Sequence, residues 1–161
     1  MKDLIDKLSS YNLFNYLLPG VVYCSIVNEV TSYEIPLSNI FLGGFLCYYI
    51  GLSISRFGSL IIEPILKKFK IIEFVNYSDF LIASEKDPKI EYLSENNNVY
   101  RTSISLFLLI ILTKLYNIAA QKLVWLSLVS PYILCISLII LFLYSYRKQT
   151  SQIVKRVKSI R

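Results

Sequence analysis

The chain has 161 residues, of which 55% are hydrophobic and 17% are charged, and its formal net charge is +6. A soluble domain carries about 25% charged residues, so this composition argues against an ordinary water-soluble domain. The chain contains no histidine and therefore lacks the commonest general base and metal ligand.

Four long apolar stretches separate clusters of charged residues. A helix needs roughly 20 mostly apolar residues to cross about 30 Å of hydrocarbon. The second and fourth stretches meet this length, whereas the first and third are shorter or interrupted. We predict an all-α integral membrane protein with four transmembrane helices, at about residues 12–30, 36–62, 101–120 and 123–146.

The first predicted span contains a helix-breaking pair, Pro19-Gly20, inside the apolar segment "NYLLPGVVY". A bilayer tolerates such a pair because neighbouring helices satisfy the freed backbone groups. In one geometry the span kinks at Pro19. In the other, residues 2–17 form a helix along the membrane surface and Pro19 opens a steeper span. The second geometry leaves only about 15 residues to cross, so we favour the kink.

Small residues recur on one face of the second span, in the segment "LGGFLCYYIGLSISRFGSL". This face is formed by Gly44, Cys47, Gly51, Ser55 and Gly58. Small residues let membrane helices approach closely. Two interpretations remain open: the face packs inside one four-helix bundle, or it joins subunits of a homo-oligomer.

Lys114 and Glu29 are the charges expected closest to the membrane on the outer side. Only 12 residues separate Lys114 from Arg101, about 18 Å along a helix, so Lys114 should lie below the outer interface. Such a charge either extends to the interface or finds a partner. Glu29 is the candidate partner. At the inner interface we expect Arg56 to pair with Glu63, two turns further along the same face.

The loop of residues 63–100 is the only sizeable part outside the predicted spans. Its first part, residues 63–75, mixes apolar and basic residues and suits a helix on the inner surface. Asp87-Pro88 is a typical helix start, from which a helix can run into the third span. A polar collar at the membrane entry is formed by Asn96, Asn97, Asn98 and Arg101. The collar is either a solvated interfacial turn or a surface that lines a vestibule or binds a partner.

The tail of residues 147–161 is a basic amphipathic segment. Its basic residues are Arg147, Lys148, Lys155, Arg156, Lys158 and Arg161. We expect it to bind the inner leaflet, with an acidic protein or nucleic acid as the alternative partner.

Basic residues also set the expected orientation. They occur at the amino terminus, in the loop 63–100 and in the tail, whereas the loop between the first two spans has none. The positive-inside rule therefore places both termini and the loop 63–100 in the cytoplasm. The expected location is the bacterial inner membrane.

The sequence shows no nucleotide-binding loop, metal-ligand cluster or nucleophile motif. We predict no catalytic, cofactor-binding or metal-binding site, and a protein that is not an enzyme. The partners we expect are the lipid bilayer, further copies of the chain and a cytosolic protein, and nucleic acid stays only an alternative partner of the tail.

Two segments, "SSYNLFNYLLPGVVY" and "EKDPKIEYLSENNNVYRT", resemble parts of small four-span bacterial membrane proteins. Some proteins of this sort belong to anti-phage defence systems, such as the membrane component of the Kiwa system and membrane-spanning effectors of nucleotide-signalling defences. The resemblance implies a role in defence; the missing motifs and the small-residue face add the expectation of a non-enzymatic component that oligomerises. It would alter membrane integrity or recruit a cytosolic partner through the loop 63–100. The alternatives are a constitutive channel or small-solute transporter, and a membrane anchor for a soluble enzyme.

Overall fold

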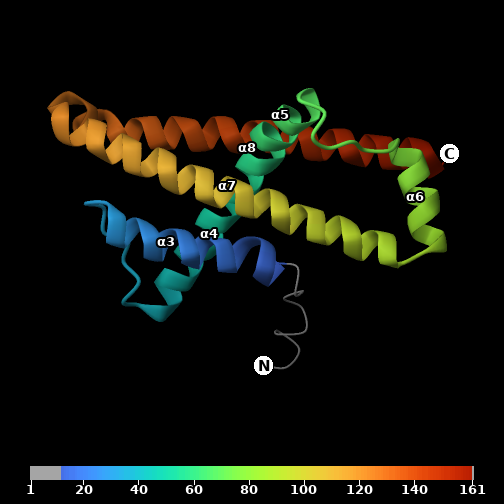
Figure 1. Ribbon diagram of the computed structural model, residues 1–161, viewed down its shortest axis with the longest axis horizontal. Coiled ribbons are helices and arrows are strands. Elements are labelled where there is room, and N and C mark those ends of the chain that lie inside the picture. The colour runs from blue at the N-terminus through green and yellow to red at the C-terminus, as the bar shows by residue number, and fades with distance from the viewer. Residues whose placement is uncertain (1–11, 161) are drawn as a thin grey trace.

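The computed structural model describes residues 12–160, which form helices and connecting loops without any strand (Figure 1). Four helical stretches are long and apolar enough to cross a membrane: Leu13–Val30, Ile40–Lys68, Lys89–Lys122 and Val124–Ser159. The predicted all-α class with four candidate spans is therefore confirmed.

The first span continues through Pro19 without a break. A π-helical turn, η1 (Leu13–Leu17), leads directly into α3 (Leu18–Val30), and the Leu18 N–H bonds to the Leu13 carbonyl. In a regular helix the proline ring would clash with the carbonyl four residues earlier, and the wider π turn accommodates it. Of the surface helix considered for residues 2–17, residues 2–11 lie outside the described residues.

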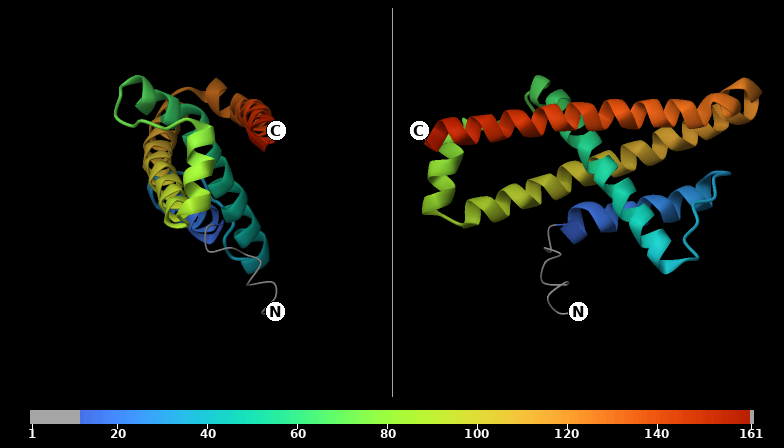
Figure 2. Two further views of the ribbon diagram at one scale, coloured as in Figure 1. Left: turned by 90° about the vertical axis from the view of Figure 1, so that its right-hand side faces the viewer. Right: turned by 180° about the vertical axis from the view of Figure 1, so that it is seen from behind.

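The second span is one long helix that begins four residues later than predicted. Asn39 caps α4 (Ile40–Phe57), since its side-chain oxygen accepts from the N–H groups of Phe41 and Leu42 at 3.1 Å. The helix continues through a second π turn, η2 (Gly58–Ile62), into α5 (Glu63–Lys68). It crosses the other long helices obliquely (Figures 1 and 2).

The third and fourth spans form a long antiparallel hairpin, α7 (Lys89–Lys122) and α8 (Val124–Ile160), with its turn at Leu123 (Figure 1). Asp87 accepts from the Lys89 N–H at 3.0 Å, at the predicted helix start. Because α8 runs without interruption past the predicted span, residues 147–160 extend it. They do not form a separate segment.

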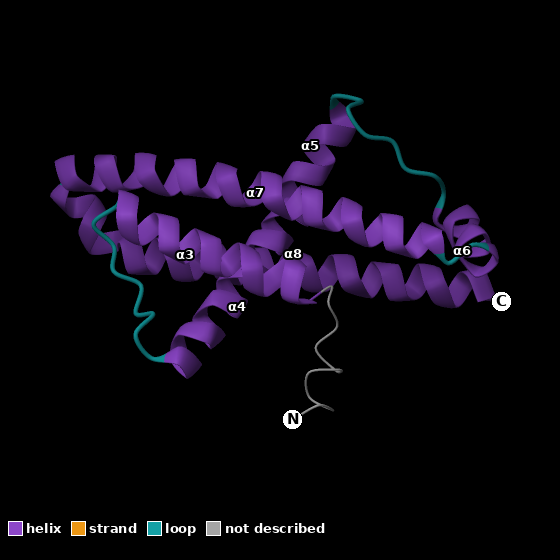
Figure 3. Ribbon diagram, turned by 60° about the horizontal axis from the view of Figure 1, so that its bottom comes forward, coloured by secondary structure: helices purple, strands orange, loops and turns teal. Residues whose placement is uncertain are grey.

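The loop 63–100 contains two short helices before α7. α5 ends at Lys68, and the chain turns at Lys70, which has a positive φ of 56°. The surface helix predicted over residues 63–75 therefore ends early, because this left-handed turn interrupts it. α6 (Tyr77–Lys86) then lies across the open end of the α7–α8 hairpin (Figures 1 and 3).

The buried core combines small and polar side chains with aliphatic ones such as Ile54, Ile62 and Leu106. In the most apolar part of the α4–α5 helix, 39% of the residues are buried. In the most apolar part of α8, no residue is buried. Large apolar side chains cover the outside, as expected for helices surrounded by lipid. The α4–α5 helix is therefore the centre of the packing, and α8 lies at its edge.

Candidate functional site: a charged cluster at the base of the loop

Glu63 is the meeting point of three helices. Its carboxylate accepts from Arg101 Nη1 at 2.8 Å, from Lys67 Nζ at 3.2 Å and from Lys148 Nζ at 3.3 Å. Arg101 belongs to α7, Lys148 to α8, and Lys67 to the same helix as Glu63. The Glu63 side chain is only 12% exposed. We call Glu63, Lys67, Arg101, Lys148 and Ser59 the Glu63 cluster.

Ser59 joins the cluster because the π turn leaves its carbonyl oxygen without a helical donor. The Glu63 N–H bonds to the Gly58 carbonyl in the π pattern, and the next residue, Pro64, has no N–H to offer Ser59. Lys148 Nζ supplies the missing donor: it lies 2.8 Å from the Ser59 carbonyl oxygen and 2.7 Å from Oγ. The π turn thus creates the acceptor that attaches α8 to the second span.

A close approach of the second span to α7 places Arg101 in the cluster. A Cβ on Gly58 would overlap the Ser105 hydroxyl and lie 3.3 Å from the Arg101 carbonyl oxygen. A side chain at this position would therefore displace the Ser105 hydroxyl and press on α7. Arg101 Nε is buried and has no partner among the described residues. The cluster contains three cations and one carboxylate, so every cation depends on Glu63 for compensation.

A buried polar triad of Asn15, Ser55 and Thr102 lies beside the cluster, since Thr102 follows Arg101. Asn15 Nδ2 donates to Ser55 Oγ at 3.1 Å, and Thr102 Oγ1 lies 2.7 Å from Asn15 Oδ1. All three side chains are buried. The triad connects the first three spans through hydrogen bonds, which are a common form of helix association in membranes.

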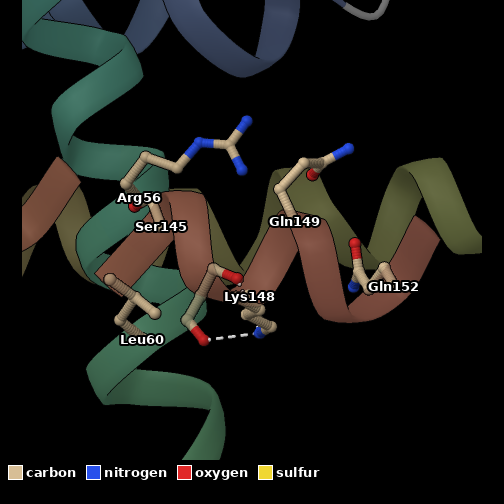
Figure 4. A pocket seen from close by; sticks show the side chains of 7 residues that line it. Arg56, Leu60, Ser145, Lys148, Gln149 and Gln152 are labelled. Carbon is tan, nitrogen blue, oxygen red and sulfur yellow. Dashed lines mark hydrogen bonds between the residues drawn. The ribbon is translucent and has the colours of Figure 1, made fainter. Parts of the chain in front are cut away.

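A small cavity between the second span and α8 adjoins the cluster (Figure 4). Its volume is about 20 Å³, and its lining includes Arg56, Ser59, Lys148 and Gln149. Lys148 bonds to Ser59. The side chains of Arg56 and Gln149 point away from the Lys148 amine (Figure 4). A cavity of this volume holds a single water and no organic ligand. The cluster therefore connects helices and does not form a substrate pocket.

The small-residue face of the second span packs mainly within the chain. Cys47, Gly51, Ser55 and Gly58 are buried. Gly44 is different, because a Cβ there would meet no atom within 4 Å. Contacts within one chain thus account for four of the five residues predicted to form this face.

The two ion pairs considered from the sequence do not form among the described residues. Lys114 donates to the Val30 carbonyl at the end of α3 and does not pair with Glu29, which is exposed. A cation is stabilised at a helix C-terminus, which explains this position. Arg56 Nη2 lies 3.4 Å from the Tyr16 hydroxyl instead of reaching Glu63. The expected Arg56–Glu63 pair is wrong because the π turn between them rotates Glu63 toward α7 and α8.

The collar and the tail each contribute one residue to the cluster. Of the collar, Arg101 binds Glu63, whereas Asn96, Asn97 and Asn98 lie in the regular helix α7, half-buried or exposed. Of the tail, Lys148 binds Glu63. The other described basic residues of the tail are exposed: Arg147, Lys155, Arg156 and Lys158. Arg161 lies outside the described residues.

Sequence reasoning missed the polar triad and the role of Glu63 as a shared partner. The available signal was the presence of Asn15 and Thr102 at the ends of apolar stretches, because polar residues inside spans mark contacts or sites. Within residues 12–160, no group of three or more Cys, Asp or Glu residues is arranged to hold a metal ion.

The fold and the cluster define a helical membrane protein with four candidate spans joined by polar contacts. Comparisons of the chain with protein-family models, with curated proteins and with solved structures give no match.

Proposed function

We propose that the chain is a non-enzymatic component of a bacterial anti-phage defence system in the inner membrane. In this proposal the loop 63–100 binds a cytosolic partner, and the Glu63 cluster transmits this event to the spans. The main support is one ion pair. The second span ends near Glu63, the third begins near Arg101, and the side chains of these two residues lie 2.8 Å apart.

The loop 63–100 exposes large apolar side chains outside the spans. Phe69, Phe74 and Val75 are 69%, 58% and 70% exposed. Grouped apolar side chains of this kind mark surfaces that bind proteins or membranes. These side chains support the binding of a protein partner by the loop, and the basic residues around it support a cytoplasmic position.

The cluster offers a route from the loop to α8. A partner that displaces α5 or the start of α7 must disturb Glu63, and Lys148 of α8 depends on the same carboxylate. Because the most apolar part of α8 has no buried residue, this helix contacts its neighbours through partly exposed side chains such as Ser130 and Phe142. Movement of α8 is therefore the change by which the protein would alter membrane integrity.

The assignment to defence rests on the resemblance of two segments to small four-span membrane proteins. These segments contain residues that form contacts between the helices. The first includes Asn15 and Gly20, and the second includes Arg101 and Thr102. The two segments thus contain two residues of the polar triad, Asn15 and Thr102, and one residue of the Glu63 cluster, Arg101.

The experiment is a phage challenge of bacteria that express the chain together with its neighbouring genes. The plaque count and a membrane-potential dye are the readouts. We expect protection with loss of membrane potential only after infection, and loss of both effects in Glu63→Gln. Glu34→Gln is the matched control, since Glu34 is an exposed carboxylate in the loop between the first two spans.

Two results would contradict the proposal. Protection that persists in the Glu63→Gln variant would show that the Glu63 cluster does not transmit partner binding to the spans. Ion conductance of the purified chain in liposomes without any partner would favour the constitutive channel instead.

A further inference from the structure

Asn117 is a buried amide without a partner. It lies near the end of α7 and is only 4% exposed. Among residues 12–160, no atom donates to or accepts from its side chain, whereas buried Asn15, Thr102 and Ser105 are all hydrogen-bonded. Most buried polar side chains have a hydrogen-bond partner, whereas the amide atoms of Asn117 have none within these residues and stay accessible from one side.

The Asn117 side chain lines a groove between α7, α8 and the loop 31–39. The groove has a volume of about 430 Å³, and its walls include Tyr33, Gln121, Ser127 and Pro131. This volume lies in the range of small-molecule sites. The missing partner of Asn117 can therefore be a ligand in this groove.

Most other polar side chains of the groove already have partners. The Ser130 hydroxyl lies 2.7 Å from the Tyr116 hydroxyl, Ser127 donates to the Val124 carbonyl, and Gln121 donates to Ser32.

One further group on the groove wall lacks its usual donor. Pro131 lies inside α8 and has no N–H for the Ser127 carbonyl oxygen, four residues earlier. The groove thus presents a backbone acceptor on one wall and a free amide on the other.

The surroundings of the groove indicate the class of ligand. No charged side chain is among its lining residues. Apolar side chains beside it are exposed, including Leu115 at 57% and Leu128 at 71%, so its mouth opens toward lipid in a bilayer. An uncharged ligand that arrives from the bilayer, with apolar chains and at least one hydroxyl, matches these features.

We propose that the groove binds a neutral glycerolipid. A free glycerol hydroxyl donates to the Ser127 carbonyl, the Asn117 amide donates to an ester carbonyl, and the acyl chain follows the exposed apolar faces of α7 and α8. This site lies near the turn of the hairpin, away from the Glu63 cluster, and does not depend on the proposed function.

The test uses the full chain in phosphatidylcholine nanodiscs and a monoacylglycerol with a photoactivatable diazirine near the glycerol. We expect crosslinks within residues 115–131 that unlabelled mono-oleoylglycerol competes away. A lysophosphatidate with the same chain and diazirine should label these residues several-fold less, because its phosphate charge has no partner in the groove. Equal labelling by the two probes would overturn the proposal.

Variants separate the amide from general lipid contact. Asn117→Leu should reduce labelling to the level seen with excess competitor, whereas Asn97→Leu, an exposed position of the same helix, should not change it. If Asn117→Leu does not fold, Pro131→Ala replaces it, because it restores an N–H to the Ser127 carbonyl and should also lower labelling. Unchanged labelling in the folded variant would overturn the proposal.

Discussion

At Gly20 of α3 and Gly51 of α4, the backbone of the other helix leaves no room for a side chain. A Cβ on Gly20 would overlap the Cys47 carbonyl and lie 3.0 Å from the Gly51 nitrogen. A Cβ on Gly51 would overlap the Tyr16 carbonyl and lie 3.0 Å from the Gly20 nitrogen. The two helices therefore meet backbone to backbone, and Cα–H groups contact carbonyl oxygens across the crossing.

Gly51→Leu should be strongly destabilising, because the overlap is with backbone that cannot move aside. Overpacking typically costs about 1–3 kcal/mol, and we expect the upper end or beyond. The measurement is the membrane yield and the thermal unfolding midpoint in mild detergent. Gly44→Leu is the control and should remain close to wild type, since no atom lies within 4 Å of a Cβ there. A Gly51→Leu protein that is as stable as wild type would contradict the crossing.

The partners of Glu63 should differ in coupling energy according to their exposure. Double-mutant cycles would combine Glu63→Gln with Arg101→Met, Lys148→Met or Lys67→Met. We expect the strongest coupling for Arg101, whose side chain is 19% exposed, and the weakest for Lys67, which is 43% exposed. Exposed pairs give about 0.2–1 kcal/mol, and groups within one network give about 0.5–3 kcal/mol. Unfolding in detergent measures these energies, and equal coupling for all three would contradict the shared-partner geometry.

Thr102→Val should destabilise the chain by about 1 kcal/mol, because it leaves Asn15 and Ser55 with an incomplete set of partners. Ser103→Ala is the neighbouring control, since Ser103 bonds only to the Val99 carbonyl of its own helix. Thermal unfolding of both variants in the same detergent is the measurement. If Ser103→Ala costs as much as Thr102→Val, the polar triad contributes nothing specific.

Cysteine labelling tests the orientation. After replacement of Cys24, Cys47 and Cys135, a Ser32→Cys variant should react with an impermeant reagent in intact cells. A Ser94→Cys variant should react only after permeabilisation, because the positive-inside rule places the loop 63–100 in the cytoplasm. Labelling of Ser94→Cys in intact cells with protection of Ser32→Cys would invert the topology.

Hydropathy and helix signals were sufficient to predict the four spans and the start of α7 at Asp87-Pro88. These features depend on local composition, so they can be read from neighbouring residues. The partners of Glu63 could not be predicted in this way. Arg56 and Glu63 are seven residues apart and share a face in a regular helix, but η2 lies between them. A π turn takes an additional residue and rotates the helix beyond it by about 100°.

The polar triad could not be predicted from the sequence, for a related reason. Each of its residues lies on a different span, so the contact depends on how the helices cross. The crossing in turn depends on Gly20 and Gly51. The sequence indicated that small residues matter in the second span, but not which helix they meet.

The Glu63–Arg101 ion pair has a consequence for the segment of chain that it encloses. Its two residues enclose 37 residues, yet their side chains are 2.8 Å apart. Chain inserted or removed between neighbouring anchor points leaves the rest of a fold undisturbed. A change in the length of the chain between Glu63 and Arg101 therefore need not separate the ends of the second and third spans.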